Sequence, residues 1–234
     1  MTLFNYQPPT DPWLDIIYQD EDIIVLNKPA WLLSVPGKHP EHADSIYTRV
    51  REILPDCQIV HRLDMATSGL IVLALHKAAE RHIKIQFQER VPQKLYYARV
   101  WGHIKPDIGK VDLPLICDWP NRPKQMVCFE RGKASLTNFA VIEREDTYAA
   151  DTTLVKLLPH TGRSHQLRVH MLSLGHPIIG DRLYAHPDAL SLSPDRMQLH
   201  ATEIRLKHPR TEEWIHFFAP CDFYPDCPKD LLKI

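Results

Sequence analysis

The stretch His61-Arg62-Leu63-Asp64-Met65-Ala66-Thr67-Ser68-Gly69, followed by Leu70-Ile71-Val72-Leu73-Ala74-Leu75, is the most informative part of this sequence. Its second half is apolar on both faces and predicts a central strand of a sheet. Its first half is polar and predicts a tight loop that enters this strand. The loop carries the carboxylate of Asp64 two residues after Arg62. A carboxylate held on a rigid element beside a cation can stay ionised and aimed, as covalent or acid–base chemistry requires.

Around this stretch the sequence predicts more strands than helices, and many strands follow one another directly. Strands are expected at 16–18, 23–26, 58–61, 96–101, 136–143, 152–158, 199–206 and 214–218, and helices at 45–54, 77–90 and 164–174. Residues 102–135 show little periodicity and predict a loop-rich region. This succession favours an α+β fold, a largely antiparallel mixed sheet with flanking helices. We expect an extended arm at 1–14, one catalytic domain at 15–220 and a tail at 221–234.

The composition restricts the class of protein. A hydrophobic content of 44% and a charged content of 24% are ordinary for a soluble globular chain. No apolar stretch approaches the roughly 20 residues that span a bilayer, and residues 1–9 lack the basic start and apolar run of a signal peptide. The five cysteines form no Cys-x-x-Cys pair, which argues against a disulfide framework or a zinc knuckle. We expect a cytoplasmic protein without a membrane partner.

The net charge of -1 does not by itself indicate a nucleic-acid-binding protein. The distribution of charge is uneven, however. Residues 81–99 contain five cations and one acid, and residues 156–170 contain three cations, three histidines and no acid. A basic cleft on a near-neutral protein is compatible with RNA, because phosphate contacts depend on the local field. Charge alone nevertheless favours the simpler explanation, an ordinary solvated surface.

Two further groups of residues could carry chemistry. Lys94-Leu95-Tyr96 begins a predicted strand, where a tyrosine is more often part of the core than a catalyst. The run from Thr161 to His170 contains a turn and the start of a predicted helix, with Arg163 and Arg168. These arginines could be solvated on a surface helix, whose core face would be Leu167, Met171 and Leu174.

Taken together, these motifs resemble the RluA family of pseudouridine synthases, which isomerise uridine in structured RNA to its C-glycoside. Residues 61–69 resemble the family's catalytic loop, and residues 94–96 and 161–170 resemble its second and third motifs. Asn27-Lys28-Pro29 with Val35-Pro36 resembles the first motif. The resemblance extends from about Asp15 to Pro220. It implies the pseudouridine synthase fold with a central RNA-binding cleft, and chemistry that needs neither a cofactor nor a metal.

The resemblance implies three catalytic residues. Asp64 is expected to act as the nucleophile or as the group that stabilises charge during the rearrangement. Arg168 matches the arginine that pairs with this aspartate, and an adjacent cation stabilises an ionised carboxylate. Tyr96 matches a tyrosine that packs on the target base and works at its C5 atom.

The resemblance also implies three residues that bind RNA. Arg62 would occupy the space of the flipped-out base or contact phosphate, because a base within folded RNA must leave its stack to react. Arg163 is suited to a phosphate, and Leu199 would support the flipped base. The short N-terminus and residues 112–124 are similar to family members that act on a 23S rRNA loop and on the tRNA anticodon stem-loop. We expect these RNA partners, a monomer, and no obligate protein partner.

One position departs from the family: Trp31 stands where its members usually have glycine. Three alternative functions are considered. A phosphotransferase with Asp64 as nucleophile would want a second acid two residues on, where the chain has Ala66. A metal site at His160, His165 and His170 conflicts with the helical spacing, since five residues place two side chains roughly 140° apart. An RNA-binding module without catalysis would not need Asp64, Tyr96 and Arg168 together.

Overall fold

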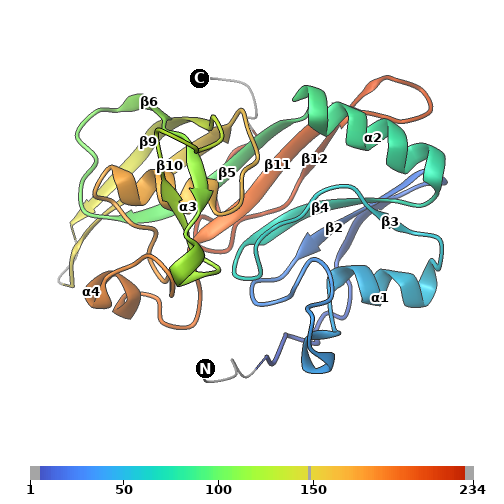
Figure 1. The fold of residues 1–234 in the computed structure, drawn as a ribbon, viewed down its shortest axis with the longest axis horizontal. Coiled ribbons are helices and arrows are strands. Elements are labelled where there is room, and N and C mark those ends of the chain that lie inside the picture. The colour runs from blue at the N-terminus through green and yellow to red at the C-terminus, as the bar shows by residue number, and fades with distance from the viewer. Residues whose placement is uncertain (1–5, 147–148, 230–234) are drawn as a thin grey trace. The chain divides into compact units, whose positions relative to one another are not determined.

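A computed structural model describes residues 6–146 and 149–229 of the chain (Figure 1). The chain forms two compact units, each built from separate segments. Unit 1 consists of residues 1–92 and 203–220, and unit 2 consists of residues 93–202 and 221–234. The second crossing between units, after residue 202, lies inside strand β11 (Leu199–Lys207).

Antiparallel strands form the sheet of unit 1. Its strands are β1 (Ile16–Gln19), β2 (Ile23–Lys28), β3 (Gln58–Ile59), β4 (Ser68–Ala74), residues 203–207 of β11, and β12 (Trp214–Phe218). Strand β2 pairs with β1 and β4, β3 pairs with β4, and β12 pairs with β11. Every residue of β4 is buried, which confirms the predicted central strand. Strand β3 is shorter than the sequence pattern suggested.

Two α-helices and a 3-10 turn, η1 (Pro40–His42), complete unit 1. Helix α1 (Ile46–Ile53) begins where predicted, because Ser45 and Thr48 form a reciprocal capping box. Helix α2 (Lys77–Glu89) packs along β3 and β4. The core of this unit joins residues of α2 to residues of the sheet. Its largest members include Ile23, Val72, Ile83, Ile204, Leu206 and Phe217.

The sheet of unit 2 is also antiparallel and has the order β5-β10-β9-β6. Its strands are β5 (Gln93–Trp101), β6 (Ile108–Asp112), β9 (Leu136–Asp146) and β10 (Asp151–Pro159). A separate hairpin contains β7 (Leu115–Cys117) and β8 (Gln125–Val127), joined through the 3-10 turn η2 (Trp119–Asn121). The prediction of a loop-rich region at 102–135 is therefore wrong in part. Strands of three to five residues between prolines are too short to show a period.

Helix α3 (Gln166–Ser173) begins two residues later than predicted, because its N-cap His165 is left-handed, with φ of 53°. Its residues from Gln166 to Met171 are all buried, including the polar Gln166, Arg168 and His170, and only Leu172 and Ser173 at its end are exposed. The expected core face is wrong at Leu174, which is 38% exposed. Helix α4 (Pro187–Ser191) has five residues, too few to be predicted from periodicity. Strand content and pairing confirm the α+β class. None of the described helices is long and apolar enough to cross a bilayer.

Candidate functional site

Main-chain hydrogen bonds hold the loop that carries Asp64, between β3 and β4 of unit 1. The Ser34 hydroxyl donates to the carbonyl oxygen of Leu63 at 2.7 Å and accepts from its amide at 3.0 Å. The Trp31 amide donates to the Met65 carbonyl at 2.8 Å, and the Thr67 amide donates to the Asp64 carbonyl at 3.1 Å. The main chain of the loop is therefore fixed on both sides of Asp64, and the Asp64 side chain is partly exposed.

Lys28 is a buried cation beneath this loop, and the sequence analysis gave it no role. Its Nζ donates to the carbonyl oxygens of Leu32 (2.7 Å), Pro29 (2.8 Å) and Met65 (3.2 Å). Burial lowers the pKa of Lys28 to about 7, and the charge of Asp64 opposes this shift. A lysine that ends an otherwise apolar strand was the available signal.

The backbone at position 31 has a conformation that favours glycine. Trp31 has a φ of 69°, in the left-handed region that glycine adopts without steric cost. Any side chain here is strained by roughly 1–2 kcal/mol. This strained residue is also the one whose amide bonds the Met65 carbonyl, directly after Asp64.

Arg62 and His61 precede Asp64 and differ in their surroundings. Arg62 is exposed, as a residue that contacts RNA requires. The His61 ring accepts the Val72 amide at its Nε2 (2.9 Å) and stacks on Phe87, with ring centroids 4.8 Å apart. His61 therefore has a structural role, to fix the loop against β4 and α2.

Arg168 is buried in unit 2, with only 4% of its surface exposed, so it is not a solvated surface arginine. Its guanidinium donates two parallel hydrogen bonds to Asp181, Nε to Oδ2 and Nη2 to Oδ1, both at 2.7 Å. Its Cζ also lies 5.0 Å from the centre of the Tyr184 ring. A bidentate pair is the strongest geometry for an arginine and a carboxylate, and it fixes the direction of the guanidinium.

Asp181 was missed by the sequence analysis. Its carboxylate also accepts the amides of Leu183 (2.9 Å) and Tyr184 (3.3 Å), which fixes it to its own turn. The turn begins at Gly180, with φ of 75°, where a Cβ would lie 2.0 Å from the carbonyl oxygen of Arg196. An aspartate directly after a glycine was the only signal in the sequence.

Lys94 and Tyr96 alternate along β5 and therefore point to the same face of the strand. Both are partly exposed, whereas Leu95 and Tyr97 between and after them are fully buried. Burial lowers the pKa of Lys94 to about 8. Its Nζ lies 3.9 Å from where a Cβ of Gly162 would stand, next to Arg163. The second and third motifs are thus neighbours within unit 2.

The remaining two predicted residues also lie in unit 2. Arg163 is partly exposed; its Nε donates to the Ala134 carbonyl (3.3 Å) and its amide donates to Gln166 Oε1 (3.0 Å). Leu199 is the first residue of β11 and is 3% exposed. The six predicted residues are divided between the units. Arg62 and Asp64 lie in unit 1, and Tyr96, Arg163, Arg168 and Leu199 lie in unit 2. The pairing of Asp64 with Arg168 stays a prediction.

None of the three histidines considered as metal ligands belongs to a ligand cluster within residues 6–146 and 149–229. His170 is buried between the Thr137 hydroxyl (2.9 Å) and the Leu113 carbonyl (3.2 Å), and burial lowers its pKa. His165 Nδ1 lies 2.7 Å from the hydroxyl of Tyr184. Both histidines are thus explained by contacts with the protein.

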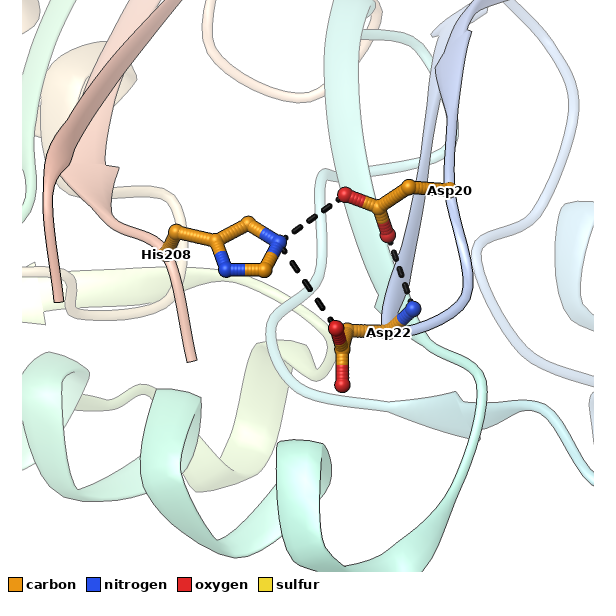
Figure 2. A group of neighbouring side chains, drawn as sticks. All are labelled: Asp20, Asp22 and His208. Atoms are coloured by element: carbon orange, nitrogen blue, oxygen red, sulfur yellow. Dashed lines mark hydrogen bonds and ion pairs between the residues drawn. The ribbon is translucent and has the colours of Figure 1, made fainter. Parts of the chain in front are cut away.

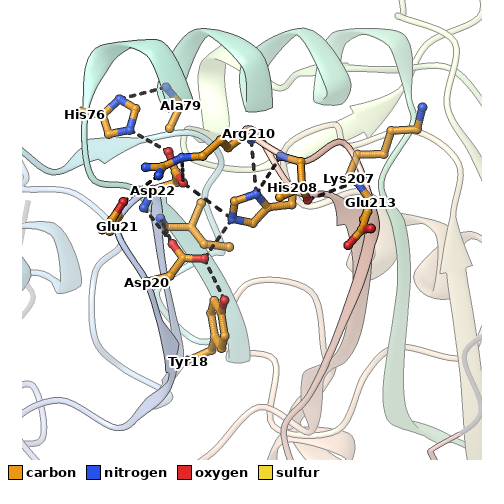
Figure 3. Close-up of polar contacts among 12 residues, drawn as sticks. Tyr18, Asp20, Glu21, Asp22, His76, Ala79, Lys207, His208, Arg210 and Glu213 are labelled. Carbon is orange, nitrogen blue, oxygen red and sulfur yellow. Dashed lines mark hydrogen bonds and ion pairs between the residues drawn. The ribbon is translucent and has the colours of Figure 1, made fainter.

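A different group of side chains in unit 1 has the composition of a metal site: Asp20, Asp22 and His208 (Figure 2). His208 Nε2 lies 2.9 Å from Asp20 Oδ2 and 3.8 Å from Asp22 Oδ2. Figure 3 shows that a protein cation already pairs with one of the two carboxylates, since Arg210 Nε lies 2.9 Å from Asp22 Oδ2. Main-chain amides, hydrogen bonds and these ion pairs lower the pKa of both aspartates against the effect of burial.

The tautomer of His208 argues against a metal ion at this group. Its Nδ1 accepts the amides of Arg210 and Thr211, both at 3.2 Å, so the ring proton is on Nε2 and faces Asp20. His76 is arranged alike, with Nδ1 accepting the Ala79 amide and Nε2 facing Asp22 (Figure 3). A protonated Nε2 has no lone pair for a metal. The group is best explained as a polar network that joins the β1–β2 turn to the β11–β12 turn.

Comparisons of the sequence with known proteins agree on one family. The family model described as RNA pseudouridylate synthase matches residues 22–173. The dual-specificity RNA pseudouridine synthase RluA of Vibrio vulnificus is 57% identical over 227 residues, which cover 97% of this chain and 90% of that protein. The protein of the same name from Escherichia coli K12 is 59% identical over 224 residues, 95% of this chain and 100% of that protein.

Solved structures agree with these relatives. Human RNA pseudouridylate synthase domain containing 1 superposes with a TM-score of 0.76 at 32% identity, and the match covers 92% of this chain and 86% of that one. Human RNA pseudouridylate synthase domain containing 4 has a TM-score of 0.71 at 24% identity, over 90% of each chain, and supports the fold alone.

Proposed function

The chain belongs to the family of RNA pseudouridylate synthases, and we propose that it isomerises uridine to pseudouridine in structured RNA through Asp64. The reaction breaks the bond between uracil N1 and ribose C1′, turns the base and forms a bond between C5 and C1′. The proton on C5 is lost and N1 gains one, so the reaction consumes no co-reactant. The observation that carries this proposal is the loop of Asp64, which main-chain bonds fix on both sides.

In this proposal Asp64 attacks the target nucleotide or stabilises its charge. Both roles need an ionised carboxylate in a constant position. The hydrogen bonds from Trp31 and Lys28 to the Met65 carbonyl support the second requirement, because they restrain the peptide that follows Asp64. Preorganised groups of this kind lower the cost of reorganisation during the reaction.

Arg168 and Tyr96 are proposed to complete the chemistry. Arg168 pairs with Asp64 and keeps it charged, and the bidentate bond to Asp181 aims its guanidinium. Tyr96 packs on the target base and handles the C5 proton. Lys94, on the same face of β5, adds positive charge beside Tyr96.

The RNA is proposed to be held by exposed and half-exposed cations. Arg62 would replace the flipped base in its stack, Arg163 would contact a phosphate, and Leu199 would support the base. The resemblance to dual-specificity relatives suggests two substrates, a 23S rRNA loop and the tRNA anticodon stem-loop. We propose that the protein acts on them in the cytoplasm, as a monomer and without a cofactor.

Release of tritium from RNA labelled at uridine C5 tests the function directly. We expect release with the wild-type protein and none above background with Asp64→Asn, while RNA affinity stays within about twofold. Asp56→Asn is a matched control, because Asp56 is an exposed aspartate in a nearby loop of the same unit. It should keep full activity.

The same assay separates the alternatives. A binding module would release no tritium from any variant, and a metal-dependent enzyme would lose activity to chelators. Unchanged turnover in Asp64→Asn would remove Asp64 from the mechanism. The pairing of Asp64 with Arg168 is tested by substituting each residue alone and both together, and by comparing the activities of the three variants. If they act as one unit, the double variant loses no more activity than the worse single variant.

A further inference from the structure

An exposed aromatic hairpin in unit 2 has no part in the roles described above. We define it as residues 115–133, which contain β7, η2 and β8. Trp119 is 64% exposed, Phe129 is 77% exposed and Met126 is 41% exposed. Large apolar side chains gathered on one short element indicate an interaction surface rather than chance exposure.

The Trp119 end of the hairpin is ordered by its own hydrogen bonds. The Asp118 amide donates to the Lys124 carbonyl, and the Asn121 amide donates to the Asp118 carbonyl, both at 3.0 Å. The guanidinium carbon of Arg122 lies 4.5 Å from the centre of the Trp119 ring. The guanidinium therefore lies over one face of the indole ring and restrains it. A base that stacks on this pair would find both side chains already ordered.

The charge of the aromatic hairpin differs from that of the chain. Between positions 115 and 133 it has four basic residues and two acids, Asp118 and Glu130, whereas the whole chain has a net charge of -1. Arg122, Arg131 and Lys133 are exposed. Exposed aromatic rings with cations beside them are the combination that binds single-stranded nucleic acid, because the rings stack on bases and the cations contact phosphates.

One residue connects the hairpin to the cluster around Arg168. The Tyr184 hydroxyl accepts the Gln125 amide of β8 at 2.7 Å and lies 2.7 Å from His165 Nδ1. The ring of the same tyrosine lies against Arg168, 5.0 Å from its Cζ. An RNA that reaches Arg168 would therefore find the base of the hairpin directly beside it.

We infer that the aromatic hairpin binds unpaired nucleotides of the RNA substrate, with a base stacked on Trp119 and Arg122. This inference rests on the proposed function and adds a specificity-determining element to it. Stacking on an aromatic ring suits single-stranded loops, because bases inside a duplex do not expose their faces. The basic side chains would contact the phosphates on either side.

The test measures the affinity of two labelled RNAs, a stem-loop and a fully paired duplex of equal length, by fluorescence anisotropy. The protein carries Asp64→Asn to prevent turnover. Trp119→Ala should weaken stem-loop binding about tenfold, as expected for the loss of one stacked base, and duplex binding less than twofold. Trp119→Phe should keep most of the affinity. Trp214→Ala is the matched control, because Trp214 is 43% exposed and also stacks with an arginine, Arg205 at 4.7 Å, but lies on β12.

Three results would contradict the inference or the function on which it rests. If Trp119→Ala leaves stem-loop binding unchanged, or weakens both RNAs equally, the stacking role is wrong. A change in sedimentation mass with unchanged RNA affinity would indicate a protein-docking surface instead. Tritium release at saturating RNA separates this inference from the proposed function. Trp119→Ala in the active protein should raise KM and leave kcat near the wild-type value, whereas absent release in the wild type would refute the function itself.

Discussion

The two charged side chains proposed for catalysis are supported in different ways. Around Asp64 the described hydrogen bonds run to main-chain atoms, from Ser34, Trp31 and the buried Lys28. Around Arg168 the guanidinium itself donates hydrogen bonds, to the carboxylate of Asp181. Unit 1 thus restrains the main chain on both sides of Asp64, whereas unit 2 holds the guanidinium of Arg168 with a bidentate carboxylate.

This difference follows from burial. Asp64 is partly exposed, so water can contribute to the solvation of its charge. Arg168 is 4% exposed, and a buried cation needs an anionic partner. Substitutions near Asp64 should therefore act through loop geometry, and substitutions near Arg168 should act through uncompensated charge.

The largest effect is expected from Asp181→Asn, which removes the buried carboxylate that accepts two hydrogen bonds from Arg168. Breaking a buried ion pair costs about 3–5 kcal/mol. Urea unfolding should show this loss in the free energy of unfolding, together with lower activity. Asp188→Asn is the control, because Asp188 is exposed on α4 and should cost less than about 1 kcal/mol. Equal losses in the two variants would contradict the importance of the buried pair.

Next in size is Lys28→Met, which removes the donor to the carbonyls of Leu32, Pro29 and Met65. Buried carbonyls without a partner should cost roughly 2–3 kcal/mol of unfolding free energy. Lys94→Met is the matched control in unit 2. Within the described residues the Lys94 ammonium has no hydrogen bond, so the change should stay within about 0.5 kcal/mol. A larger loss for Lys94→Met than for Lys28→Met would reverse the comparison.

Lys28 also makes stability depend on pH. Its pKa is about 7 in the folded protein and near 10.4 in an unfolded chain. Between these values the unfolded state binds more protons, so the free energy of unfolding rises with pH, by up to about 1.4 kcal/mol per pH unit. The wild type should gain stability relative to Lys28→Met between pH 7 and about pH 10. A difference that is constant over this window would show that Lys28 keeps its proton.

The smallest effect concerns the strained residue beside the Asp64 loop. Trp31→Gly and Trp31→Ala both lose the indole ring, but only glycine adopts the φ of 69° without strain. The glycine variant should be more stable than the alanine variant by about 1 kcal/mol. Trp214→Gly and Trp214→Ala, in strand β12, should show the opposite order, because glycine weakens a strand. Thermal unfolding of the four variants measures both differences.

The sequence predicted the helices and strands whose hydrophobic pattern extends over many residues. Strands β4, β9 and β10 and helix α2 appear where expected, because seven or more residues establish a period or an unbroken apolar run. Residues 102–135 were misjudged because their strands are short. Helix α3 was predicted within two residues of its ends, but the burial of every residue from Gln166 to Met171 leaves no periodicity from which to infer its environment.

The site was predicted in the same uneven way. Asp64 and Arg168 stand in motifs whose residues are adjacent in the chain, so a resemblance could identify them. Lys28 bonds the Met65 carbonyl, 37 residues away, and Asp181 bonds Arg168, 13 residues away. Nothing in the sequence around Lys28 or Asp181 identifies these partners. The strained backbone of Trp31, with φ of 69°, could not be inferred from its sequence position alone.

The division of unit 1 into two chain segments has a consequence for protein synthesis. Its core needs Ile204, Leu206 and Phe217, which leave the ribosome more than a hundred residues after β4. Strands β5 to β10, with their complete antiparallel order, are translated in between. During translation, the apolar residues of the first ninety positions that pack against these three side chains stay exposed until the end of the chain is made. The middle of the chain can fold before then.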